Sequence, residues 1–206
     1  MASNLGFEHV LVRGASTFTL LLLHGTGGDE HQLVGLGRQL APGATLLSPR
    51  GKELEGGVSL RFFRRLALGE FDIPDLLART DELAGFVAAA RTEYGLGDVV
   101  ALGYSNGANI AASMLFRRPE ALAGAALLRA TLPFEPEAVP AVAGKRVLLA
   151  TGTRDPYVPE TASDRLAELL EGGGAEVTYL KSERGHDLAP EELGAVGEWL
   201  RRAALF

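Results

Sequence analysis

The sequence contains no cysteine, which excludes disulfides, thiolate metal sites and a cysteine nucleophile. It also lacks long apolar runs: the longest, residues 20–23 and 99–102, are far below the roughly 20 residues of a membrane-spanning helix. Basic blocks are missing too, because the formal net charge of −6 comes from acidic and basic residues mixed along the chain. We therefore expect no nucleic-acid partner and no stable membrane anchoring.

The length and composition fit one compact unit. A chain of 206 residues that is 47% hydrophobic can fill a single sizeable core, so we expect one domain spanning residues 1–206. Residues 1–8 lack the basic start and apolar run of a secretory signal. A cytoplasmic location is the expectation that follows.

Apolar runs of strand length alternate with longer amphipathic segments, and the runs consist largely of consecutive Val, Leu and Ala. This pattern is typical of a parallel sheet covered by helices on both faces, and it predicts an α/β fold with a mostly parallel central sheet. The expected strands are residues 8–12, 18–23, 45–48, 99–104, 124–128, 146–151 and 176–180. The expected helices are residues 29–40, 76–94, 106–117, 159–171 and 190–203.

Two features of the early part of the chain shape the expected architecture. Asp29 followed by Gln32 has the spacing of a capping box and predicts a helix start at Asp29. Residues 49–75 show no clear periodicity and are expected to form one long irregular segment. Because irregular segments of this length are often functional, we expect residues 49–75 to form a pocket wall.

The segment Gly103-Tyr104-Ser105-Asn106-Gly107 has the pattern Gly-x-Ser-x-Gly, in which a serine nucleophile sits on a tight turn between a strand and a helix. Chance supplies this pattern easily in a chain with 26 glycines. Its context is more specific, because a strand-like run, residues 99–102, precedes it and an Ala-rich helical run, residues 108–116, follows. The alternative is a glycine-rich turn with a capping serine; the context favours Ser105 as a nucleophile.

A serine nucleophile needs a base, and the base needs an acid to orient it. In this type of fold the chain order is Ser, then Asp or Glu, then His, and His186 is the only histidine after Ser105. Asp155 follows an apolar strand, whereas Asp164 falls inside a predicted helix and Asp187 adjoins His186. The predicted triad is Ser105, Asp155 and His186. The alternatives are that His186 is a loop residue with no catalytic role and that Asp155 only stabilises the turn in which it lies.

An acyl-transfer site also needs two backbone donors for the oxyanion. One is expected from Asn106, the residue after the nucleophile, and one from the glycine-rich residues 22–29, where Thr26 holds the expected position. His24 in the same segment is expected to hold the loop. It is disfavoured as a base because it precedes Ser105.

Several motifs together resemble the phospholipase/carboxylesterase family of α/β-hydrolases, and specifically its small bacterial carboxylesterases, which are related to acyl-protein thioesterases. The resemblance spans nearly the whole chain and is carried by Leu23–Glu30, Arg61–Phe63, Leu102–Ala111, Asp155–Pro159 and Gly185–Leu188. It implies the triad Ser105, Asp155 and His186, an oxyanion hole from the amides of Thr26 and Asn106, no cofactor or metal, and often a homodimer. One departure is Leu128–Pro133, where family members tend to carry a methionine near Leu132, which puts the fit of the substrate in doubt.

The expected activity is that of a serine carboxylesterase acting on small esters through an acyl-enzyme. The interval between the strands at residues 124–128 and 146–151 is too short for a cap domain, so we expect an open, shallow pocket and short- to medium-chain substrates. The nearest wall residues are expected to be Arg61, Phe62 and Phe63. The alternative for the two phenylalanines is core packing, and for Arg61, Arg64 and Arg65 it is a solvated face or recognition of an anionic group.

Two other functions remain open. An acyl-thioesterase or lysophospholipase would use the same triad, and the sequence does not separate these activities. A binding protein of the same fold without catalysis is the third reading, disfavoured because every triad member and both oxyanion segments are present.

Overall fold

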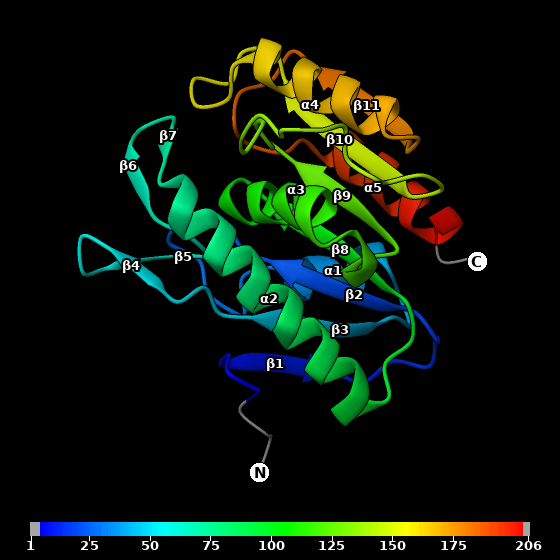
Figure 1. Cartoon of the computed structure of the whole chain (residues 1–206). Coiled ribbons are helices and arrows are strands. Elements are labelled where there is room, and N and C mark those ends of the chain that lie inside the picture. Colours follow the sequence, from blue (N-terminus) through cyan, green and yellow to red (C-terminus); the bar gives the residue numbers. More distant parts are fainter. Residues whose placement is uncertain (1–4, 204–206) are drawn as a thin grey trace.

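The computed structural model describes residues 5–203; residues 1–4, the start of the segment considered above as a signal, and residues 204–206 lie outside the described residues. A seven-stranded sheet with the order β1-β3-β2-β8-β9-β10-β11 forms its centre (Figure 1). Every neighbouring pair is parallel except β1 and β3. The strands are β1 (His9–Val12), β2 (Thr19–Leu23), β3 (Thr45–Pro49), β8 (Val99–Tyr104), β9 (Gly124–Leu128), β10 (Arg146–Gly152) and β11 (Glu176–Ser182).

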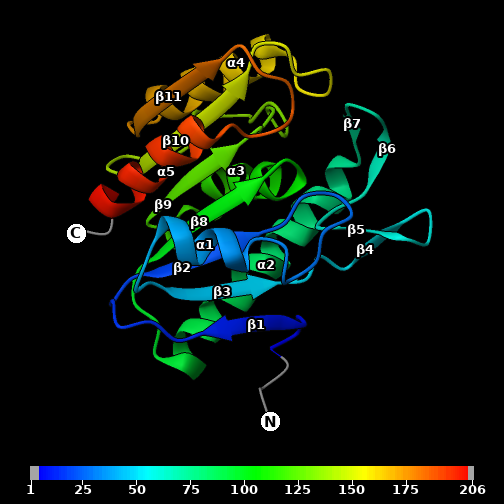
Figure 2. The same cartoon turned by 180° about the vertical axis from the view of Figure 1, so that it is seen from behind.

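Helices cover both faces of this sheet. One face carries α2 (Ile73–Tyr94), α3 (Asn106–Arg117) and α4 (Glu160–Gly172), and the other carries α1 (Val34–Leu40) and α5 (Pro190–Ala203) (Figures 1 and 2). A 3-10 turn, Pro119–Ala121, follows α3. The prediction of a mostly parallel sheet flanked by helices is therefore confirmed.

The central strands show why their sequences are continuously apolar. All five residues of β2 are buried, and alternate leucines enter different cores because successive side chains point to opposite faces. Leu21 and Leu23 pack in the core under α2, α3 and α4, whereas Leu20 and Leu22 pack in the core under α1 and α5. The two apolar layers therefore hold the central strands in place, and with them the loops that follow the strand ends.

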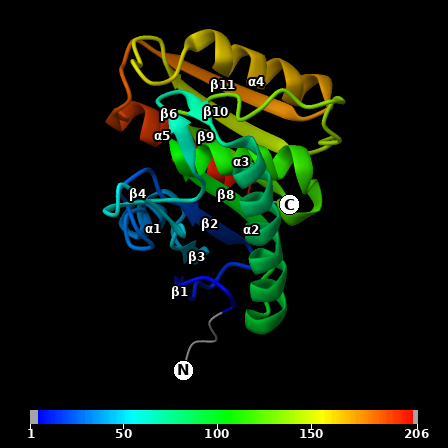
Figure 3. The ribbon, with the colours of Figure 1, turned by 60° about the vertical axis from the view of Figure 1, so that its left-hand side comes forward.

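Residues 49–75 differ from the expectation of one irregular segment. They contain two short hairpins, β4 (Glu53–Glu55) with β5 (Ser59–Arg61) and β6 (Arg65–Ala67) with β7 (Glu70–Phe71). Figure 1 shows both hairpins outside the central sheet, near the amino end of α2, and in Figure 3 the strands β4 and β6 lie apart from one another. Strands of two or three residues are too short to produce a readable alternation, which explains why the sequence pattern missed them.

The predicted helix start at Asp29 was also wrong. Residues 30–33 form turns and α1 begins at Val34. The capping box does not form, because the Gln32 side chain accepts a hydrogen bond from the Gly25 amide (2.9 Å) instead of reaching back to Asp29. The Asp29 carboxylate accepts from the His31 amide (2.9 Å). Gln32 therefore supports the preceding loop.

The connection between β9 and β10, residues 129–145, contains neither helix nor strand, so no cap rises from this part of the sheet. None of the helices between residues 5 and 203 combines the length and apolar character of a membrane span.

Candidate active site

Ser105 occupies the turn between β8 and α3. Its backbone has φ 53° and ψ −114°, a conformation that costs a non-glycine residue energy and persists only where its surroundings impose it. Neighbouring backbone crowds both flanking glycines: a Cβ on Gly103 would lie 2.5 Å from the Gly107 carbonyl oxygen, and one on Gly107 would lie 2.0 Å from the Leu23 carbonyl oxygen. A side chain at either position would therefore clash with backbone atoms.

Ser105 and Asn106 are tied to their surroundings by separate hydrogen bonds. The Ser105 amide donates to the Leu128 carbonyl at the end of β9 (2.8 Å), and the Asn106 side-chain oxygen accepts from the Phe62 amide (2.7 Å). Asn106 is the first residue of α3, where backbone N–H groups have no partner within the helix and favour negative charge. The turn therefore presents a hydroxyl beside a helix amino end.

His186 and Asp155 meet Ser105 from two other loops at the carboxyl ends of the strands. His186 lies in the histidine loop, residues 183–189, between β11 and α5, and Asp155 follows β10. The His186 Nε2 atom is 2.9 Å from Ser105 Oγ, and its Nδ1 atom is 2.7 Å from Asp155 Oδ2. The structure thus brings these three predicted residues into one hydrogen-bonded chain.

The Asp155 carboxylate is held on both oxygens. Oδ1 accepts from the amides of Tyr157 (2.8 Å) and Val158 (3.2 Å), and the side chain is 0% exposed. Because a carboxylate can only accept hydrogen bonds, the proton between Asp155 and His186 must sit on His186 Nδ1. The Nε2 atom is then unprotonated and accepts a hydrogen bond from the serine hydroxyl. The arrangement can take up the serine proton and stabilise the resulting imidazolium.

The glycine loop, residues 24–29, lies between β2 and α1 and is held mainly by His24. Its Nε2 atom accepts from the Gly51 amide (2.9 Å), so Nδ1 carries the proton and donates to the Gly25 carbonyl (2.8 Å). Burial lowers the pKa of His24 below its ordinary value, which favours the neutral ring that these two bonds need. His24 holds the loop, as expected.

Thr26 lies at the exposed part of the glycine loop. Its hydroxyl accepts from Arg61 Nη1 (2.8 Å), and the next amide, of Gly27, donates to the Leu60 carbonyl (2.9 Å). Strand β5 therefore braces the loop. Sequence reasoning assigned Gln32 only a helix cap and missed that its side chain holds Gly25; a polar side chain seven residues beyond a glycine was too weak a signal.

The three predicted wall residues are buried. Phe62 packs against the His24 ring at 4.6 Å between centroids and Phe63 against Phe71 at 5.1 Å. Arg61 donates to the Phe63 carbonyl (3.1 Å) as well as to Thr26, and burial lowers its pKa. Their contacts are with the glycine loop, Asn106 and the core, and contact with a substrate stays a prediction.

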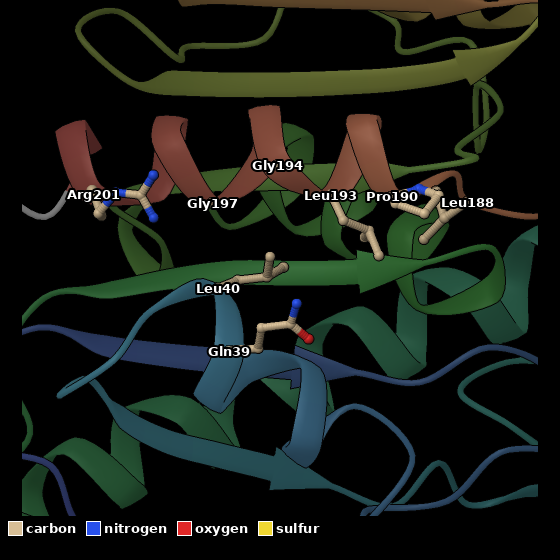
Figure 4. A pocket seen from close by; sticks show the side chains of 8 residues that line it. All are labelled: Gln39, Leu40, Leu188, Pro190, Leu193, Gly194, Gly197 and Arg201. Carbon is tan, nitrogen blue, oxygen red and sulfur yellow. The ribbon is translucent and has the colours of Figure 1, made fainter.

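A hollow of about 440 Å³ lies between α1 and α5, on the face of the sheet that these two helices cover (Figure 4). Its lining includes Leu40 of α1 and Gly194 and Gly197 of α5, and none of Ser105, Asp155 or His186. The hydrogen-bonded chain at the carboxyl ends of the strands is accordingly the candidate site.

Comparison with known proteins gives consistent full-length matches, although no protein-family model matches the chain. MhqD of Bacillus subtilis (strain 168), whose name assigns it only to the hydrolases, is 42% identical over 198 residues, covering 95% of this chain and 98% of MhqD. The crystal structure of a Bacillus cereus carboxylesterase has a TM-score of 0.94 and 45% identity, with 98% and 96% of the two chains covered. That of a Mesorhizobium loti carboxylesterase has a TM-score of 0.90 and 34% identity, with 98% and 97% covered.

A mostly parallel sheet with a serine on a strained strand-to-helix turn defines an α/β-hydrolase-type fold. With these relatives, the chain belongs to the phospholipase/carboxylesterase family of α/β-hydrolases, and it is a hydrolase.

Proposed function

We propose that this hydrolase is a serine carboxylesterase in which Ser105 is the nucleophile, His186 the general base and Asp155 its orienting acid. The observation that carries the proposal is the continuous hydrogen-bonded chain from Ser105 Oγ through His186 to a buried Asp155. The carboxylesterase relatives of Bacillus cereus and Mesorhizobium loti support the choice of carboxylic esters.

The chemistry follows from these positions. Ser105 Oγ attacks the acyl carbon while His186 takes its proton, and the amides of Thr26 and Asn106 stabilise the oxyanion. When the tetrahedral intermediate collapses, the ester C–O bond breaks and His186 returns the proton to the departing alcohol. Water, deprotonated by His186, then hydrolyses the acyl-enzyme and regenerates Ser105.

The proposed substrates are short- and medium-chain esters. Ser105 and His186 are both partly exposed, and residues 129–145 form no helix that could cover a long acyl chain. A series of p-nitrophenyl esters of increasing chain length tests this range; a clear optimum at long chains would contradict it. Thioesters and lysophospholipids belong in the same series, since the same triad would cleave them. The homodimer implied by the family stays a prediction for sedimentation measurements.

The decisive test is Ser105→Ala, which removes the nucleophile. We expect ester hydrolysis to fall by about a thousandfold or more, with no labelling by a fluorophosphonate probe. Ser113→Ala is the matched control, because Ser113 lies in α3, the helix that directly follows Ser105, but its hydroxyl bonds that of Thr80 (2.6 Å). Unchanged turnover by Ser105→Ala would refute the assignment of Ser105 as the nucleophile.

A further inference from the structure

Arg129 is a fully buried arginine for which the catalytic scheme above has no role. It directly follows β9, in the segment that departs from the family pattern, and its side chain is 0% exposed. Its φ is 57°, a left-handed conformation that is uncommon for a residue with a long side chain. Both the burial of a charge and the backbone conformation are costly, so the surroundings must favour this placement.

The guanidinium of Arg129 contacts both neighbours of His186. Nε donates to the Gly185 carbonyl (2.9 Å) and Nη2 to the Asp187 carbonyl (2.7 Å). The carbonyl between them, that of His186, accepts from the Tyr104 hydroxyl (3.1 Å). Three successive carbonyls of the histidine loop are therefore each held by a side chain from the neighbouring part of the sheet.

Glu192 of α5 neutralises this buried cation. Its Oε2 atom accepts from Arg129 Nη2 (2.9 Å) and from the Ala189 amide (2.8 Å), and its Oε1 atom accepts from the Ser182 hydroxyl (2.9 Å). Ser182 directly precedes the histidine loop and Ala189 is its last residue. The ion pair therefore fastens the loop ends as well as its centre.

The backbone next to Arg129 also reaches the nucleophile. The Leu128 carbonyl accepts from the Ser105 amide (2.8 Å), and the Arg129 amide donates to the Ala150 carbonyl of β10 (2.8 Å). One short segment after β9 thus binds the serine turn through its backbone and the histidine loop through the Arg129 side chain.

We propose that Arg129 is a positioning residue for the hydrolytic reaction: by binding the carbonyls on both sides of His186, it holds the imidazole within hydrogen-bonding distance of Ser105. Glu192 keeps the guanidinium in place. This role rests on the proposed function, because Arg129 makes no contact with the substrate and acts only through the base, His186.

The planar fork of the guanidinium is what this role requires. Its N–H groups point in fixed, divergent directions and reach carbonyls two residues apart, whereas a lysine ammonium is a single compact charge. Arg129→Lys therefore keeps a cation beside Glu192 but loses the span between the carbonyls of Gly185 and Asp187. This variant separates the positioning role from simple charge neutralisation.

The test measures steady-state kinetics of p-nitrophenyl ester hydrolysis by Arg129→Lys. We expect kcat to fall by about tenfold or more, since small displacements of a base are costly, with KM changed by less than about twofold. The second-order rate of labelling of Ser105 by a fluorophosphonate should fall by a similar factor, because this reaction also needs the base. Turnover and labelling within about twofold of the parent enzyme would overturn the proposal.

A control separates positioning from loss of stability. Leu122→Ala opens a core cavity just before β9, at the opposite end of that strand from Arg129, and should lower the melting temperature with unchanged kcat well below it. Should Arg129→Lys lose no more activity than Leu122→Ala at equal loss of stability, Arg129 is merely structural. If Arg129→Lys does not fold, the double variant Arg129→Met with Glu192→Met, which removes both charges, takes its place. This double variant should fold but show the same fall in kcat and in the labelling rate. Turnover equal to that of the parent enzyme would overturn the proposal.

The two proposals fail in different ways. Turnover retained by Ser105→Ala refutes the triad whatever Arg129 does. Turnover lost by Ser105→Ala but retained by Arg129→Lys refutes only the positioning role.

Discussion

The two loops that flank Ser105 are fastened to the fold by different means. The glycine loop is held chiefly by two neutral groups, the buried imidazole of His24 and the amide of Gln32, and the charged Arg61 reaches it only through the Thr26 hydroxyl. The histidine loop is held by the buried ion pair of Arg129 and Glu192. Neutral hydrogen bonds each contribute modestly, whereas a buried ion pair tolerates the loss of neither partner. The two loops should therefore respond differently to mutation and to acid.

The largest expected effect comes from breaking the ion pair. Glu192→Ala leaves the fully buried guanidinium of Arg129 unpaired and should lower the free energy of unfolding by about 3–5 kcal/mol, measured by urea denaturation. Arg129→Met with Glu192→Met should recover most of that loss. The control is Arg154→Ala, which removes an exposed ion pair with Glu183 near the same loop, the two side chains being 71% and 82% exposed, and should cost less than about 1 kcal/mol. Equal losses in Glu192→Ala and Arg154→Ala would contradict the comparison.

A smaller effect is expected at the glycine loop. His24→Leu leaves the Gly51 amide and the Gly25 carbonyl without their partner and should cost about 1–3 kcal/mol, again by urea denaturation. Turnover should fall as well, because this loop carries the Thr26 amide that is proposed to stabilise the oxyanion. His31→Gln is the matched control, since His31 is exposed and makes neither bond; a comparable loss in His31→Gln would argue against the role of His24.

The smallest effect is a difference in pH dependence. Because the pKa of His24 lies below 6.5, the unfolded chain binds a proton that the folded chain does not, and stability falls as the pH drops below 6.5. Burial raises the pKa of Glu192, but hydrogen bonds from Arg129, Ala189 and Ser182 outweigh it and hold it below 4.5. That contribution is complete above 4.5 and is lost as the pH falls through the folded value.

Midpoints of urea denaturation, measured from above pH 6.5 to below pH 4.5, show whether the His24 contribution is lost at a higher pH than the Glu192 contribution. His24→Leu should flatten the stability profile just below pH 6.5, and Glu192→Gln should flatten it only below about pH 4.5. Identical profiles for both variants and the parent would show that neither group carries the dependence.

Much of the site was predictable because it follows from the order of elements in a parallel sheet. The carboxyl ends of parallel strands meet at one edge, so residues directly after strands, such as Ser105, Asp155 and His186, were expected to gather there. His186 was further fixed by being the only histidine after Ser105. The structure brings these residues together, while their catalytic roles stay proposals.

The supporting contacts were not predictable from local pattern. Arg129 binds carbonyls 56 and 58 residues away and a carboxylate 63 residues away, and no periodicity records such distances. Gln32 has the spacing of a helix cap, but its side chain binds the Gly25 amide instead of capping a helix. Both cases involve polar side chains whose partners are chosen by the assembled fold.

The two hairpins between residues 49 and 75 have a consequence for how this enzyme can diversify. Their strands pair only with each other, and none of the registers of the central sheet includes them. Val58, Leu66 and Leu68 are exposed on them, away from the cores that hold the strands. We therefore expect insertions or substitutions at these tips to leave the pairing of the central sheet unaltered, and with it the relative positions of Ser105, Asp155 and His186 at the strand ends.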